Sequence, residues 1–113
     1  MVPDRFASID THGLVRIASA TPRASVGNVE SNADAILDLA NKAARAGADI
    51  VLFPELCLSS YAIDDLHLQE TPLDRVETEI ARLVEASRQL PVLLIGAPVR
   101  RAGRLYNAAL VIA

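Results

Sequence analysis

The sequence lacks most of the features that mark secreted, membrane-spanning or nucleic-acid-binding proteins. It has a single cysteine, Cys57, so an internal disulfide bond cannot form and we expect a reducing, cytoplasmic environment. No apolar stretch reaches the roughly 18 residues that a membrane helix needs, and the first residues lack the apolar core of a signal peptide. The net charge of -3 argues against nucleic acid or an anionic membrane as a partner.

Several functional motifs are also absent. The sequence contains neither a glycine-rich phosphate-binding loop nor a serine nucleophile elbow. His12 and His67 have no metal-ligand spacing with each other, with Cys57 or with Asp64 and Asp65, so we expect no metal site. Repeats and linkers are lacking too, and 113 residues leave room for one domain.

Two segments have the apolar periodicity of amphipathic helices. The first begins after Asn28 or Ser31 as the capping residue and ends at Gly47, a residue that readily adopts the left-handed conformation. Its apolar face comprises Val29, Ala33, Ile36, Leu37, Ala40, Ala43 and Ala44. The second begins at Thr71-Pro72 and ends before Pro91.

The second helix is expected to bury one face and to pair charges on the other. The buried face is predicted to comprise Leu73, Val76, Ile80, Leu83, Val84 and Ser87. The predicted ion pairs are Arg75 with Glu79 and Glu85 with Arg88.

Four apolar runs predict strands over residues 14–20, 50–53, 92–95 and 105–112. Gly96-Ala97-Pro98 is expected to end the third strand, and residues 101–104 are expected to form a hairpin turn. Three arginines around Gly103 are expected to be solvated: Arg100, Arg101 and Arg104. With the two helices, the order is β-α-β-α-β-β, which is an α/β fold.

Glu55 is the strongest candidate for a catalytic residue. The run Ile50 to Phe53 has the length and composition of a strand buried on both faces, and Pro54 ends it. Glu55 therefore lies just past the carboxyl end of a strand, where α/β sheets collect ligands and catalytic groups. A carboxylate that only caps the following turn is the alternative interpretation.

The segment around Glu55 resembles a known catalytic block. Phe53-Pro54-Glu55-Leu56 followed by Ser59-Ser60-Tyr61 is similar to the first catalytic block of the nitrilase (carbon–nitrogen hydrolase) superfamily. Four further segments are similar to the amino-terminal glutaminase domain of glutamine-dependent NAD synthetases: residues 12–18, 61–69, 92–98 and 104–107. The resemblance covers nearly the whole chain from His12 to Ala113 and implies an incomplete α-β-β-α sandwich.

The resemblance also implies a mechanism and partners. Nitrilase-type enzymes use a Glu–Lys–Cys triad, in which Glu55 matches the base, and Tyr61 matches a wall of the substrate pocket, although an ordinary core tyrosine is the alternative. The parent enzyme would hydrolyse glutamine and pass ammonia to a carboxy-terminal synthetase domain, which amidates deamido-NAD with ATP and Mg. For residues 1–113 the resemblance implies no cofactor, and for the parent it implies a homo-oligomer.

The other two triad members have no match in this sequence. The only lysine, Lys42, precedes Glu55 on a predicted helix, whereas the family's lysine follows the glutamate. Cys57 would share a face with Glu55 if the backbone were extended, so a pair is conceivable, but a free cysteine more commonly packs as a small apolar residue. We therefore expect residues 1–113 to be inactive alone.

Ala113 directly follows an apolar strand, which would leave a sheet edge unpaired. We therefore expect an incomplete domain whose exposed apolar surface at residues 105–112 favours self-association.

Two other functions stay open. A stand-alone amidase, nitrilase or carbamoylase would use the same triad. A non-catalytic α/β interaction module would fold as a stable monomer, and Glu55→Gln would not change its function.

Overall fold

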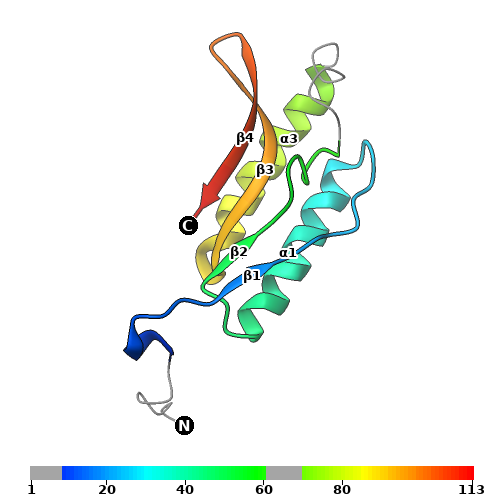
Figure 1. Ribbon diagram of the computed structural model, residues 1–113. Helices are drawn as coiled ribbons and strands as arrows, with labels where there is room; N and C mark the ends of the chain where they lie inside the picture. The colour runs from blue at the N-terminus through cyan, green and yellow to red at the C-terminus, as the bar shows by residue number, and fades with distance from the viewer. Residues whose placement is uncertain (1–8, 61–69) are drawn as a thin grey trace.

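The computed structural model describes residues 9–60 and 70–113, which form a four-stranded sheet with two long helices on one face (Figure 1). The strands follow one another across the sheet in the order β1-β2-β3-β4. Their bounds are Ile17–Ser19 for β1, Ile50–Leu52 for β2, Val92–Arg101 for β3 and Arg104–Ile112 for β4. The first three strands are parallel, and β4 is antiparallel to β3. The predicted α/β fold with the order β-α-β-α-β-β is confirmed.

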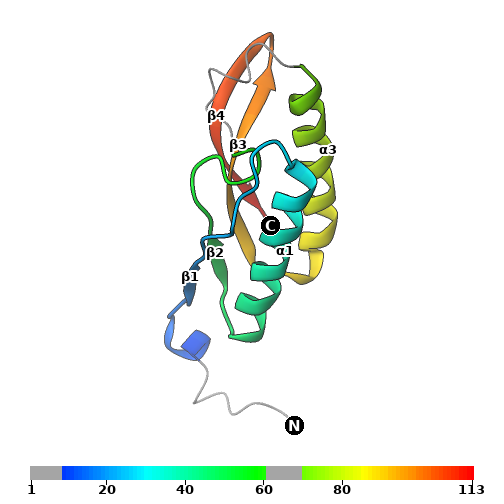
Figure 2. The ribbon, with the colours of Figure 1, turned by 90° about the vertical axis from the view of Figure 1, so that its right-hand side faces the viewer.

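The two helices, α1 (Val29–Arg45) and α3 (Glu70–Ala86), lie side by side against the same face of the sheet (Figure 2). Short 3-10 helices precede β1 and follow α3, at Ile9–His12 and Ser87–Gln89. None of the helices in the described part of the chain is long and apolar enough to span a bilayer.

The two ends of α1 agree with the signals in its sequence. The Asn28 side chain caps the helix by accepting a hydrogen bond of 3.0 Å from the backbone N–H of Ser31. Gly47 follows the last turn with φ of +83°, a conformation that a residue without a Cβ adopts at no steric cost.

The core lies between the helices and the covered face of the sheet. Val51, Leu93 and Ile95 point from the strands toward the helices and are fully buried. From the helices, Ile36 of α1 and Leu83 of α3 belong to the same buried cluster. About 25 cal/mol of stabilisation comes from each Å² of apolar surface removed from water, so this layer supplies most of the driving force for folding.

The other face of the sheet has no covering element within residues 9–60 and 70–113 (Figure 2). Ile17, Leu52 and Val111 are 60%, 46% and 71% exposed. The expected apolar surface near the carboxyl end is therefore present at Val111, although its neighbour Ile112 is buried on the helix side. The expected self-association stays a prediction.

Two strands differ in length from their sequence predictions. β1 is shorter, because it pairs only with the three residues of β2, and Leu14 and Val15 lie outside it and are exposed. β3 is longer, because β4 pairs with it up to Arg101. The prediction that residues 96–98 end this strand was wrong. Pro98 lies beyond the last pair with β2, so β3 has a free edge there that tolerates a residue without an N–H.

The turn between β3 and β4 confirms the predicted hairpin. Arg101 pairs with Arg104, and the two residues between them, Ala102 and Gly103, have φ of +51° and +72°. Two consecutive residues with positive φ are typical of the two-residue turns that match strand twist. Arg100 is not a simple solvated charge, because it forms ion pairs with Asp74 and Glu77 of α3.

The charge pattern of α3 was predicted only in part. Glu85 and Arg88 pair at 3.2 Å as expected, but Arg75 approaches Glu30 of α1 at 4.0 Å instead of Glu79. Glu79 is nearly buried and bonds to Arg82.

Arg82 links the two helices, because it pairs with Glu79 of α3 and also with Asp34 of α1, at 2.8 Å. The predicted buried face of α3 is correct except at Val84, which is half exposed. The helix also begins earlier than expected, at Glu70, so that Thr71 and Pro72 lie in its first turn.

Candidate functional site

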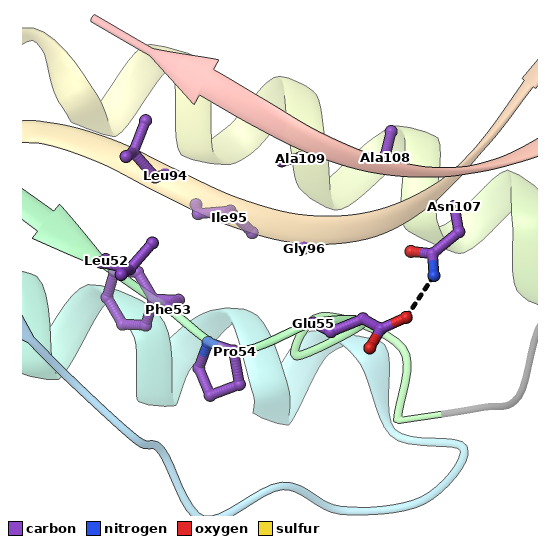
Figure 3. A pocket seen from close by; sticks show the side chains of 10 residues that line it. All are labelled: Leu52, Phe53, Pro54, Glu55, Leu94, Ile95, Gly96, Asn107, Ala108 and Ala109. Atoms are coloured by element: carbon purple, nitrogen blue, oxygen red, sulfur yellow. Dashed lines mark hydrogen bonds between the residues drawn. The ribbon is translucent and has the colours of Figure 1, made fainter.

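Glu55 lies at the carboxyl end of β2, beside a cavity on the open face of the sheet (Figure 3). The cavity has a volume of about 320 Å³ and is formed by β2, β3, β4 and the residues that follow β2. Its walls are mostly apolar and include Phe53, Pro54, Ile95 and Ala108. The carboxylate is solvent-exposed and is the one ionisable group among the lining residues. A single carboxylate at an apolar cavity is suited to accepting a proton from a bound reactant.

Asn107 of β4 contacts this carboxylate directly. Its Nδ2 donates a hydrogen bond to Oε1 of Glu55 (Figure 3). The contact joins residues that are 52 positions apart, and it depends on the register in which Asn107 lies opposite Pro98. This role was not predicted from the sequence, in which Asn107 was assigned only to a strand and to a segment of the family resemblance.

Gly96 of β3 lets the segment after β2 lie directly on the sheet. A Cβ at this position would lie 2.4 Å from the backbone nitrogen of Leu56 and 2.6 Å from the carbonyl oxygen of Pro54. The carbonyl oxygen of Gly96 in turn accepts a hydrogen bond of 3.3 Å from the backbone N–H of Leu58. Only glycine permits this close approach of two backbones, so the position of Glu55 depends on it.

The segment that carries Glu55 forms a tight turn. The backbone N–H of Cys57 donates to the carbonyl of Pro54 at 3.3 Å, and that of Ser60 donates to the carbonyl of Leu56 at 2.9 Å. Leu56 and Ser60 have φ of +50° and +56°. Positive φ costs roughly 1–2 kcal/mol for a residue with a side chain, so surrounding contacts must hold the turn in place.

Asn32 of α1 provides such contacts from beneath the turn. It is 1% exposed, and its Nδ2 donates to the carbonyl oxygens of Leu58 and Ser25, each at 3.0 Å. Its Oδ1 accepts a hydrogen bond of 2.7 Å from the backbone N–H of Ser25. The sequence did contain a signal for this role, because Asn32 is a polar residue three positions after Val29 on the buried face of the helix.

Cys57 does not form a pair with Glu55. The turn directs the two side chains to different environments, and Cys57 is 5% exposed while Glu55 is exposed. The sulfur lies 3.6 Å from the carbonyl oxygen of Gly96, and burial raises the pKa of the thiol. The interpretation of Cys57 as a packed small residue is confirmed, and the shared face was wrong because the backbone is not extended here.

Lys42 does not line this cavity. Lys42 is exposed on α1, where it approaches Asp38 at 3.7 Å. Tyr61, together with His67 and the Asp64-Asp65 pair, lies outside the described residues. Within the described part of the chain, no three His, Cys, Asp or Glu side chains gather as a metal site would require.

Comparison with known proteins bears on this site. The family model for carbon–nitrogen hydrolases matches residues 15–113. The glutamine-dependent NAD(+) synthetase of Mycobacterium tuberculosis is 44% identical over 108 residues, which cover 95% of this chain and 16% of the relative. The enzyme of the same name from Xanthomonas campestris is 38% identical over 107 residues, covering 94% of this chain and 19% of the relative. The chain therefore spans less than one fifth of the length of these curated relatives.

Solved structures agree with the fold. A glutamine-dependent NAD+ synthetase from Acinetobacter baumannii, in complex with ADP, superimposes with a TM-score of 0.75 at 30% identity, covering 84% of this chain and 18% of that one. An amidase from Nesterenkonia gives 0.69 at 27% identity, covering 77% of this chain and 33% of that one. The predicted nitrilase-type fold is confirmed by these similarities.

Proposed function

Because this chain belongs to the carbon–nitrogen hydrolase family, we propose that it supplies the general base, Glu55, for hydrolysis of a carbon–nitrogen bond. The observation that carries the proposal is the Glu55 carboxylate, which borders the apolar cavity at the end of β2. Its Oε1 accepts a hydrogen bond from Asn107, which also lines that cavity.

The chemistry of amides explains why a base is needed. An unactivated amide requires a strong nucleophile, a base that deprotonates this nucleophile, and a donor that stabilises the oxyanion. A thiol with an ordinary pKa of about 8.5 is mostly protonated near neutral pH. A carboxylate within reach takes this proton, and such general-base help contributes typically about 10²–10⁴-fold in rate.

The nucleophile and the oxyanion donor must come from outside the described residues. Cys57 is buried beneath the turn, and Lys42 is on the outer surface of α1. The amidase from Nesterenkonia has an active-site cysteine to which acrylamide adds, which supports a thiol as the nucleophile. We propose that residues beyond this chain in the parent protein supply both a cysteine and a lysine, and that residues 1–113 alone are inactive.

The proposed substrate is glutamine. Support comes from the glutamine-dependent NAD synthetases that share 44% identity with this chain. The ammonia released from glutamine would pass to a synthetase domain of the parent protein, which amidates deamido-NAD with ATP and Mg. The complex of the Acinetobacter baumannii enzyme with ADP supports nucleotide use by the parent protein.

The experiment uses a chimera in which this chain replaces the 108-residue segment of the Mycobacterium tuberculosis synthetase to which it aligns. We expect the chimera to make NAD from either glutamine or ammonia. Glu55→Gln should lower the glutamine-dependent kcat by about 10²-fold or more and leave the ammonia-dependent rate unchanged. Glu85→Gln, an exposed carboxamide substitution on α3, is the matched control and should change neither rate.

The outcomes separate the alternatives. Full glutamine-dependent activity of Glu55→Gln would overturn the proposal and favour a non-catalytic interaction module. A chimera that hydrolyses short aliphatic amides through Glu55, but does not hydrolyse glutamine, would favour a stand-alone amidase.

A further inference from the structure

Asn107 is the one partner that the described residues offer to the Glu55 carboxylate. It reaches the carboxylate from β4, whereas Glu55 follows β2, and β3 lies between these strands. Figure 3 shows the two side chains pointing toward each other across the mouth of the cavity.

Asn107 lies on a fully paired strand. Every residue of β4 pairs with β3, and the next two positions, Ala108 and Ala109, have small side chains that leave the cavity open. The contact is therefore built from a fully paired strand on one side and from a turn packed on Gly96 on the other. The strand that carries Asn107 and the turn that carries Glu55 are both held by backbone contacts, and precise placement of a catalytic group requires such support.

In this hydrogen bond Asn107 is the donor and Glu55 is the acceptor. A carboxylate only accepts hydrogen bonds, so the amide nitrogen of Asn107 must face it, and its N–H engages the Oε1 atom. A base must be charged to take up a proton. The hydrogen bond therefore engages one of the two carboxylate oxygens that could take up this proton.

We propose that Asn107 is a positioning residue for the general base, an inference that rests on the proposed function. It holds Oε1, so that Oε2 is the oxygen that accepts the proton. In the step concerned, the S–H bond of a cysteine thiol from outside the described residues breaks and an O–H bond forms at Oε2. The sulfur keeps the electron pair with which it attacks the amide carbon. Asn107 itself touches no reacting atom.

The experiment measures kcat and KM for glutamine in the chimera. Asn107→Leu keeps the approximate volume and removes the donor, and we expect kcat to fall about 10- to 100-fold while KM changes less than about threefold. Asn107→Asp places a second carboxylate against Glu55, and its kcat should fall at least as far as that of Asn107→Leu. Asn107→Gln, which keeps a donor on a longer side chain, should recover part of the loss.

A double-mutant cycle distinguishes positioning from a general structural role. If Asn107 acts through Glu55, the double variant Glu55→Gln/Asn107→Leu should be no slower than Glu55→Gln alone, whereas a structural role predicts that the losses multiply. The ammonia-dependent rate should stay unchanged in every variant, which shows that the synthetase part of the chimera is intact.

Two results would overturn the inference and can be told apart from failure of the proposed function. Asn107→Leu with a kcat within twofold of the parent chimera, or losses that multiply in the cycle, would exclude the positioning role while Glu55→Gln still lowers activity. If Glu55→Gln leaves glutamine hydrolysis intact, the proposed function fails first.

Discussion

The two faces of the sheet differ sharply although the same strands supply both. Leu93 points toward the helices and is fully buried, whereas its neighbour Leu94 lies on the open face and is only partly buried. The same contrast separates Val51 from Leu52. Strand residues are therefore apolar on both faces, a pattern typical of a sheet that is covered on both sides. The candidate site lies on the open face, where the turn after β2 lies against Gly96 and the other described residues leave the sheet uncovered.

The largest expected effect comes from adding a side chain at Gly96, where the backbone of the turn after β2 lies on the open face of the sheet. Gly96→Ala would place a methyl group 2.4 Å from the nitrogen of Leu56, so the turn that carries Glu55 must move. We expect a loss of about 3 kcal/mol or more in the free energy of unfolding of the chain, measured by urea denaturation. Ala109→Ser, at the exposed register partner of Gly96, is the control and should stay within about 0.5 kcal/mol. Equal stability of the two variants would show that the close approach is not a constraint.

The neighbouring leucines of β3 test the contrast between the faces directly. Leu93→Ala leaves a cavity in the core and should cost about 2–5 kcal/mol in the same measurement. Leu94→Ala removes a side chain that is already partly in water and should cost less than about 1 kcal/mol. In the chimera, where further residues can cover the open face, the difference should shrink. A similar cost for both variants in the chain alone would contradict the assignment of the faces.

The two asparagines of α1 give a smaller contrast between buried and exposed positions. Asn32→Ala would leave the buried carbonyl of Leu58 without its donor, and we expect a cost of about 1–3 kcal/mol. Asn41→Ala removes an exposed bond to the carbonyl of Leu37 and should change the stability by less than about 0.5 kcal/mol. Because Asn32 also supports the turn, Asn32→Ala should lower the glutamine-dependent kcat of the chimera. An unchanged kcat would show that the turn holds its shape without Asn32.

The smallest expected effect concerns Cys57 and appears only at alkaline pH. Burial raises the pKa of its thiol, so the folded chain keeps this proton to a higher pH than the unfolded chain. The associated stability is complete below the unfolded pKa and is lost as the pH rises through the folded pKa, by up to about 1.4 kcal/mol per pH unit between the two values. Cys57→Ala should therefore lose less stability than the parent chain between pH 7 and pH 10. Identical pH profiles would show that the thiol is not buried.

Local signals were sufficient to predict much of the fold. The Asn28 cap, the left-handed Gly47 and the hairpin turn at Ala102-Gly103 each depend on a few adjacent residues, and each is present in the structure. The position of Glu55 at the end of β2 was predicted for the same reason, because an apolar run followed by proline determines where a strand stops.

Contacts between distant segments could not be predicted in this way. The bond between Asn107 and Glu55 depends on the register of β4, and the burial of Glu79 depends on how α3 packs against α1. Pro98 is tolerated within β3 only because β2 has already ended. Each of these depends on tertiary neighbours that a short window of sequence does not contain.

The close approach at Gly96 determines which residues of this site can vary in evolution. The location of the Glu55 backbone is set by main-chain atoms of β3 that touch main-chain atoms of the turn, and not by the identity of the apolar side chains that line the cavity. These apolar side chains are therefore free to vary and to select different substrates, while the turn and Asn107 keep the carboxylate in its place. One scaffold can in this way serve a series of enzymes that share a reaction but not a substrate.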